Sequence, residues 1–167
     1  KLPPDLAALL NSFDTNVKLV VSKLRANGVA VRGSLIDIGL IGGEFTFRNI
    51  RVDDLGGAKF AFQGKAGGLD KNPFVDGRID IQAANVQGLA RLAGLTLPVP
   101  PARLGRFHAA GKINGSGEAI GLDLTLLAAR TSAAIKGNIA LKEMLPNYKL
   151  ALTASNKSYV DLWQTFD

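Results

Sequence analysis

The sequence contains no cysteine and only one histidine, His108. The absence of cysteine excludes internal disulfides, thiolate metal sites and cysteine nucleophiles, although it does not identify the cellular compartment. A single histidine is too few for the usual zinc ligand sets, and no local motif places a serine and a carboxylate beside it. The sequence therefore predicts neither a structural zinc site nor a histidine-based active site.

Other short motifs for catalysis or cofactor binding are incomplete. Asp53-Asp54 precede a glycine pair, where acidic residues commonly solvate a turn. Gly111-Lys112 lacks the glycine spacing and the following Ser or Thr of a phosphate loop, and Gly115-Ser116-Gly117 lacks the third glycine of a dinucleotide motif. We therefore predict a non-enzymatic protein with no catalytic residues, no metal and no cofactor.

Aromatic residues are scarce and long apolar runs are missing. Aromatics make up 7% of a chain that is 47% hydrophobic, so its apolar content is mostly aliphatic. No run of about 18 apolar residues is present, and the opening Lys1-Leu2-Pro3-Pro4-Asp5 does not form a signal peptide. We expect the chain to be a fragment whose membrane anchor or export signal lies outside it.

The charge balance is basic but dispersed. A formal net charge of +6 over 167 residues suits an anionic partner, either phospholipid headgroups or nucleic acid, but basic residues spread along strands also simply solvate one face. A nucleic-acid site needs stacking aromatics among the basic residues, and Phe45 and Phe47 near Arg48 and Arg51 come nearest to this. We assign these phenylalanines to an apolar face and expect no nucleic-acid partner.

Most of the chain alternates between apolar and polar residues with a period of two, which predicts strands with one apolar and one wetter side. Glycine-containing dipeptides separate the runs, and such short links favour antiparallel neighbours. The alternating apolar sets include Val17, Leu19 and Val21; Ile36, Ile38 and Leu40; Phe45 and Phe47; Phe60 and Phe62; Ile79 and Ile81; Leu122 and Leu124; and Ile135 and Ile139.

Three segments have helical spacing instead. For the second of them, Asn85 is the expected N-cap and Gly94 the expected C-terminal stop. The apolar residues of the three predicted helices are Leu6, Leu9 and Leu10; Val86, Leu89, Leu92 and Ala93; and Val160, Trp163 and Phe166.

A weak internal repeat relates two parts of the chain. Gly64 maps onto Gly137 and Pro73 onto Pro146, both at an offset of 73 residues (137−64 and 146−73). The shared order of glycine, proline, strand, cap residue and helix favours a duplication. We predict two repeat units, residues 1–97 and 98–167, in one continuous body. The predicted fold class is α+β and β-dominated: a curved, mainly antiparallel, groove-like or half-open sheet with about three short helices, built from a duplicated strand–helix unit.

Several segments together carry a family resemblance that extends from Leu2 to the end of the chain. An opening helix leads into the alternating stretch 16–24, and similar stretches follow at 42–50, 55–66 and 74–81, the last leading into residues 86–89. In texture and order these segments resemble the AsmA-like family of bacterial envelope proteins, which includes the TamB and YhdP groups. No single motif carries the resemblance.

The resemblance implies a periplasmic region, tethered by an inner-membrane helix outside this chain, in which strands curl into a groove with an apolar inner face. The implied role is phospholipid handling between the inner and outer membranes in support of outer-membrane biogenesis. The implied partners are phospholipid acyl chains, with other envelope proteins or neighbouring repeats of the same chain as further candidates. Candidate groove residues are Phe45, Phe47, Phe60, Phe62, Ile79, Ile81, Leu122, Leu124, Ile135 and Ile139.

Two other readings of the same residues stay open at this point. The apolar residues can fill a closed sandwich or lie under the predicted helices, in which case no groove forms. A scaffold that uses exposed strand edges to bind partner proteins, without lipid, is the alternative function. An enzyme acting on envelope glycans or lipids ranks below both, because it needs two carboxylates that converge in one cleft.

Overall fold

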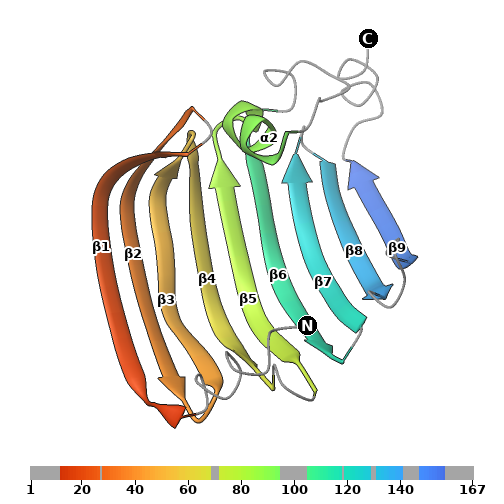
Figure 1. The fold of residues 1–167 in the computed structure, drawn as a ribbon. Coiled ribbons are helices and arrows are strands. Elements are labelled where there is room, and N and C mark those ends of the chain that lie inside the picture. The colour runs from red at the N-terminus through yellow and green to blue at the C-terminus, as the bar shows by residue number, and fades with distance from the viewer. Residues whose placement is uncertain are drawn as a thin grey trace.

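The computed structural model describes residues 12–26, 28–68, 72–94, 105–117, 119–128, 131–140 and 147–156, which form nine strands and one short helix (Figure 1). The helix is α2, Gln87–Ala93. The strands are β1 Thr15–Ala26, β2 Val29–Ile41, β3 Glu44–Leu55, β4 Ala58–Gly67, β5 Phe74–Ala83, β6 Phe107–Ser116, β7 Ala119–Ala128, β8 Thr131–Ala140 and β9 Asn147–Asn156.

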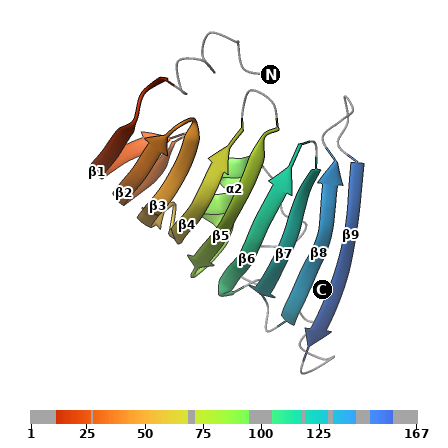
Figure 2. The same cartoon turned by 90° about the horizontal axis from the view of Figure 1, so that it is seen from below.

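All nine strands belong to one antiparallel sheet, and each pairs with the strand that follows it in the sequence. This simple meander agrees with the short links, and the β2–β3 link uses glycine in the expected way. Gly42 and Gly43 have φ values of 53° and 75°, which a two-residue hairpin turn needs at both central positions. β1 and β9 lie at opposite sides of the sheet and do not pair with each other, so the described strands form an open sheet (Figures 1 and 2).

The strand register places apolar residues beside apolar residues across the whole sheet. Directly paired residues of antiparallel strands share a face. One row of successive partners crosses all nine strands: Leu19, Ile36, Ile50, Phe62, Ile79, Gly111, Leu124, Ile135 and Leu152. The adjacent row contains Val17, Ile38, Phe47, Gly64, Gly77, Ile113, Leu122, Gly137 and Leu150. We call the side that carries these rows the apolar face and the opposite side the polar face.

A bulge in β3 keeps this face continuous. Phe45 and Phe47 have odd numbers, whereas Ile50 and Val52 have even numbers, so regular alternation would place the two pairs on opposite faces. The register of β3 shifts by one residue between them against both neighbouring strands. Because the bulge adds one residue, all four side chains lie on the apolar face.

The residue at the bulge, Arg48, is held on the polar face. Its Nε donates a hydrogen bond to Asp37 Oδ1 at 2.7 Å, and its Nη1 donates one to Asn16 Oδ1 at 2.8 Å. The guanidinium lies over Gly39, where an added Cβ would be 2.6 Å from Arg48 Nη1. The bulge therefore aims a charged side chain away from the apolar face.

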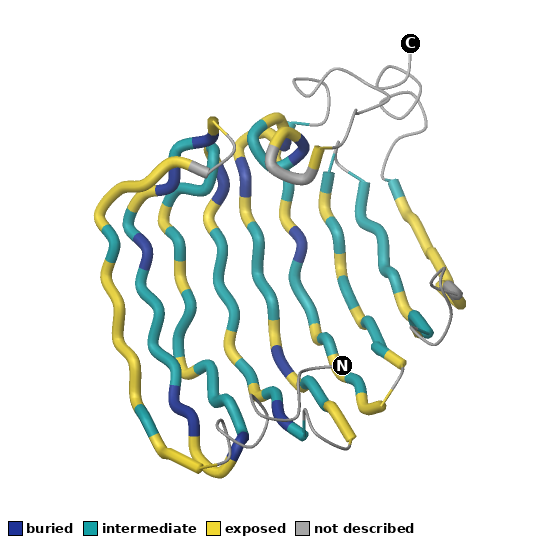
Figure 3. Tube along the Cα trace, in the orientation of Figure 1, coloured by how far each residue is buried: buried dark blue, intermediate teal, exposed yellow. Residues whose placement is uncertain are grey.

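Most of the buried apolar residues lie at the end of the sheet where α2 lies, and Leu40 is buried at the opposite end (Figure 3). At the α2 end, the helix packs closely against the β3–β4 turn, since a Cβ on Gly88 of α2 would be 1.8 Å from the carbonyl oxygen of Gly56 in that turn. No large side chain among the described residues is fully buried. The sheet is thus a single layer without a conventional two-layer core over most of its area. The buried apolar residues near α2 are Val29, Val31, Ala58, Ala83, Val86 and Ala90.

The predicted α+β fold class is wrong. The described residues form a nearly all-β molecule with one short helix, and the two outer helices predicted at 4–10 and 158–166 lie outside the described residues. α2 follows the second predicted helix closely: Gly94 ends it in the left-handed conformation at φ 66°, as expected. Its N-cap position is Val86, although Asn85 Oδ1 accepts a hydrogen bond from Gln87 N at 3.1 Å.

The predicted strand–helix repeat is also wrong as a description of the fold. What recurs at the 73-residue offset is a pair of strands, because β4 and β5 begin at residues 58 and 74 whereas β8 and β9 begin at residues 131 and 147 (131−58 and 147−74). β5 and β6, which belong to the two different predicted units, pair over their full length. The offset of 73 residues spans β6, β7 and the α2-containing link between β5 and β6, and the second helix of the predicted unit lies outside the described residues.

Candidate binding face

All of the predicted groove residues lie on the apolar face. Phe45, Phe47, Phe60 and Phe62 come from β3 and β4, and the isoleucines and leucines come from β5, β7 and β8. Their strand partners on this face are apolar residues or glycines, as in the pairs Phe60–Ile81 and Ile120–Ile139. The register therefore brings together residues from strands that are up to 94 positions apart in the chain (139−45).

Three phenylalanines form a cluster on this face. The ring centroids of Phe45 and Phe47 are 6.2 Å apart in a stacked arrangement, and those of Phe47 and Phe62 are 5.5 Å apart, edge to face. The Phe62 ring lies against Gly77, where an added Cβ would be 2.6 Å from the ring. Glycine at this position lets the aromatic ring lie down on the backbone instead of standing away from it.

Further glycines form a shallow region in the middle of the apolar face, because they carry no side chain. Gly64 and Gly77 are direct partners in β4 and β5, and Gly111 and Gly137 occupy β6 and β8. A Cβ at Gly111 would be 2.0 Å from the carbonyl oxygen of Asp123, a backbone atom that has no freedom to turn away. These positions present backbone at the surface between the larger leucine and isoleucine side chains.

The apolar face is not covered by a second layer of described residues, since α2 is the one helix outside the sheet among them. Interior side chains of the face are half-buried because their lateral neighbours shield them. Shielding is weakest on the two edge strands, where Leu19 of β1 is 48% exposed and Leu152 of β9 is 68% exposed. A continuous apolar surface of this kind on a protein marks a site of association.

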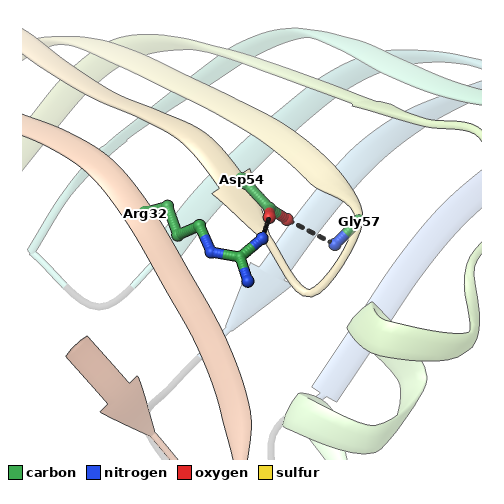
Figure 4. A network of polar contacts seen from close by, with 3 residues as sticks. All are labelled: Arg32, Asp54 and Gly57. Carbon is green, nitrogen blue, oxygen red and sulfur yellow. Dashed lines mark hydrogen bonds and ion pairs between the residues drawn. The ribbon is translucent and has the colours of Figure 1, made fainter. Parts of the chain in front are cut away.

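Charged residues enter the apolar face at one corner. Lys23 and Arg32 are direct partners in β1 and β2, and Arg25 follows Lys23 on the same side of β1. Arg32 Nη1 lies 3.1 Å from Asp54 Oδ2, while Asp54 Oδ1 accepts a hydrogen bond from Gly57 N at 2.8 Å (Figure 4). We call Lys23, Arg25 and Arg32 the cationic corner; the predictions from sequence did not include it.

The polar face carries most of the ion pairs. They are solvent-exposed and each contributes at most about 1 kcal/mol, so their main effect is to keep this face in water. The pairs on this face are Arg48–Asp37, Arg51–Asp53, Lys65–Glu44, His108–Asp80 and Lys136–Asp123.

The candidate catalytic groups do not converge. Asp53 and Asp54 lie on opposite faces, the first beside Arg51 and the second beside Arg32. His108 Nε2 lies 2.8 Å from Asp80 Oδ2 on the exposed polar face, and no serine is among its hydrogen-bond partners in the described ranges. Within those ranges no group of three or more His, Cys, Asp or Glu side chains is positioned to hold a metal ion.

The polar face also has a shallow depression that is surrounded by polar and basic side chains. Ala61 and Ala110 form its small floor residues, and Gln63, Arg78 and Lys112 stand around it. Arg78 and Lys112 are direct partners in β5 and β6, and neither makes an ion pair with another described residue. This pair is a useful counterpart to the cationic corner because it carries the same kind of charge on the opposite face.

Comparison of the chain with protein-family models, with curated proteins and with solved structures found no match. Among the described helical residues, none form a helix long and apolar enough to cross a membrane.

Proposed function

We propose that this chain is a non-enzymatic, AsmA-like segment of a bacterial envelope protein that holds phospholipid acyl chains on its apolar face. In this proposal the segment lies in the periplasm, tethered to the inner membrane through a part of the protein outside this chain. It helps to pass phospholipid between the inner and outer membranes. The observation that carries the proposal is the continuity of the apolar face, on which two adjacent rows across nine strands contain only apolar residues and glycine.

Acyl chains fit such a face for simple physical reasons. They need exclusion of water and dispersion contacts, and each methylene removed from water contributes about 0.8 kcal/mol. A ten-residue strand such as β4 spans about 33 Å. Since the hydrocarbon core of a bilayer is about 30 Å thick over two leaflets, one strand is long enough for a whole acyl chain.

A scaffold without lipid is the second candidate, and the open edges of the sheet favour it. β1 and β9 each have one side that pairs with no described strand, and such edges accept added strands from partner proteins. Lipid binding requires the apolar face, whereas strand addition requires the backbone edges. The two functions are therefore separable by substitution.

The test is extraction of the purified chain followed by mass spectrometry of any lipid, with a photo-crosslinkable phospholipid supplied in parallel. We expect co-purified phospholipid. Phe62→Glu should reduce the captured lipid about tenfold, because a carboxylate on the face must be desolvated under the acyl chain. Gln63→Glu, the next residue on the polar face, is the matched control and should leave capture unchanged.

Leu152→Glu is a second charged substitution on the apolar face that should leave the fold intact, because Leu152 is mostly exposed and its replacement removes little packing. Each variant is checked by far-UV circular dichroism and thermal unfolding before lipid is measured. Absence of captured and crosslinked lipid from the folded wild-type chain would contradict the proposal, and so would equal losses in the Phe62 and Gln63 variants. Retained partner binding in a folded variant that captures no lipid would favour the scaffold.

A further inference from the structure

The apolar face ends in charge at one corner only. Within the described strands, every position of this face is uncharged except Lys23, Arg25, Arg32 and Asp54, and all four lie at the same end of β1–β3. A solvating role would scatter such charges around the margin of the face. Because they are concentrated at one corner, the apolar face has one charged end and one uncharged end.

The corner holds an excess of positive charge. Lys23 and Arg32 are direct cross-strand partners, and like charges in that arrangement repel. Asp54 is the single carboxylate on this part of the face, and it is engaged with Arg32 and with the amide of Gly57 (Figure 4). Lys23 and Arg25 make no ion pair with any described residue. An anion placed here would relieve the repulsion.

The apolar face leads directly away from this corner. Behind Lys23 and Arg32 come Val21 and Ser34, and then the uncharged row that begins with Leu19. From Arg32 to Leu40 the alternate residues of β2 span about 26 Å, if each residue advances about 3.3 Å. An amphiphile with its charged group at the corner therefore has room for its acyl chain along β1–β3.

We propose that the apolar face selects anionic phospholipid, with the headgroup phosphate at Lys23, Arg25 and Arg32 and the acyl chains directed along β1–β3 toward Phe45. This inference rests on the proposed lipid-holding function and adds to it the class of lipid and its orientation. Arg32 suits the role because its planar guanidinium can bind phosphate oxygens while its other side faces Asp54. Lys23 and Arg25 supply the remaining charge.

The test measures which lipid the protein loads from vesicles of phosphatidylcholine and phosphatidylglycerol in equal parts. After separation from the vesicles, the ratio of the two lipids on the protein is read by mass spectrometry. We expect the wild-type chain to be enriched in phosphatidylglycerol. Lys23→Thr/Arg25→Thr should lower that ratio about fivefold, the effect of two partly solvated charge contacts, while total loading changes little.

Arg78→Thr/Lys112→Thr is the matched control, because it removes two unpaired basic residues from a direct partner pair on the opposite face. This control should keep the enrichment. An equal drop in both double variants would overturn the inference, since it would reveal a general attraction to anionic vesicles. Wild-type loading without any preference would also overturn it and leave the lipid-holding function intact, whereas absence of loading would contradict that function itself.

Inorganic phosphate distinguishes a lipid headgroup from a free anion. Titration of the lipid-free protein with phosphate, followed by calorimetry, should give no saturable binding, because the acyl chain supplies most of the affinity. Saturable phosphate binding that is lost in Lys23→Thr/Arg25→Thr would identify a free-anion site and overturn the assignment to lipid.

Discussion

Glycines on the apolar face set how closely neighbouring strands approach one another. At Gly111 an added Cβ would meet only backbone, namely the carbonyl of Asp123 at 2.0 Å and the Cα of Leu124 at 2.8 Å. At Gly121, in the next strand, the nearest atom would be the side-chain oxygen of Asn114 at 2.4 Å, which can move. The same substitution therefore has different consequences at two neighbouring positions.

We predict that Gly111→Ala lowers the free energy of unfolding by about 1–3 kcal/mol, because the added methyl forces β6 and β7 apart. Gly121→Ala is the control and should cost far less, since Asn114 can rotate and alanine orders the unfolded chain. Urea denaturation followed by circular dichroism measures both. Equal midpoints for the two variants would mean that the close backbone approach at Gly111 does not constrain the sheet.

The side of the sheet on which the groove candidates lie was predictable from sequence, because residues of the same parity within one regular strand share a side. The cationic corner was missed, although its signal was present. Lys23 and Arg25 have the same parity as Val17 and Leu19, which places them on the apolar side of β1. Their association with Arg32 and Asp54 depends on the register of two hairpins, and the sequence reading assigned dispersed basic residues to the solvated face.

At the scale of elements, the β3 bulge shows how one residue controls the side that a half-strand presents. The change from odd to even apolar positions between Phe47 and Ile50 was readable in the sequence, but a bulge and a strand end give the same pattern there. In the structure, the extra residue is accommodated with Arg48 aimed at Asp37. The insertion and the side chain at this position therefore have separable roles.

We predict that Arg48→Ala costs at most about 1 kcal/mol in unfolding free energy, since it removes exposed polar contacts only. Deletion of Arg48 should keep all four apolar side chains on the apolar face, because Phe47 and Ile50 are then two positions apart and alternate regularly. Deletion of both Arg48 and Asn49 should be far more disruptive, because it makes Phe47 and Ile50 adjacent and turns one apolar pair to the polar face. Hydrogen exchange of the β3 amides and binding of a hydrophobic dye report the difference. Native exchange rates in the variant that lacks both residues, or loss of protection in the variant that lacks Arg48 alone, would contradict this account of the bulge.

Of the three predicted helices, one is present as α2 and the other two lie outside the described residues. Helical spacing near Val86 was followed by a glycine suited to the left-handed cap, and α2 ends at Gly94 as this pattern indicates. The predicted strand–helix unit failed because the β4–β5 and β8–β9 strand pairs are what recur at the 73-residue offset, and the sheet continues from β5 to β6 without a boundary between units. The C-terminal cap of α2 was thus readable from sequence, whereas its N-cap is Val86 and not the predicted Asn85. The assembly of hairpins into one sheet required the pairing of strands.

At the scale of the whole molecule, a nine-stranded single layer leaves a large apolar surface in contact with water when no lipid is bound. Such a surface has a strong tendency to be covered, and two sheets that pack face to face bury it at a spacing of about 10 Å. The edges of the sheet offer a different route to association through backbone pairing. Substitutions on the two faces of β9 separate these routes.

We predict that the lipid-free chain self-associates through its apolar face and that bound phospholipid returns it to the monomer. Leu150→Lys/Leu152→Lys places two charges on the apolar face of β9 and should weaken self-association at least about tenfold, because two charges must be desolvated in the contact. Ala151→Lys/Thr153→Lys places the same charges on the polar face of the same strand and should leave it unchanged. Sedimentation velocity over a range of protein concentrations, with and without phospholipid, measures the effect. Equal weakening by both variants would assign the contact to the β9 edge, and a lipid-free wild-type chain that stays monomeric would contradict the exposed apolar face on which the lipid proposal depends.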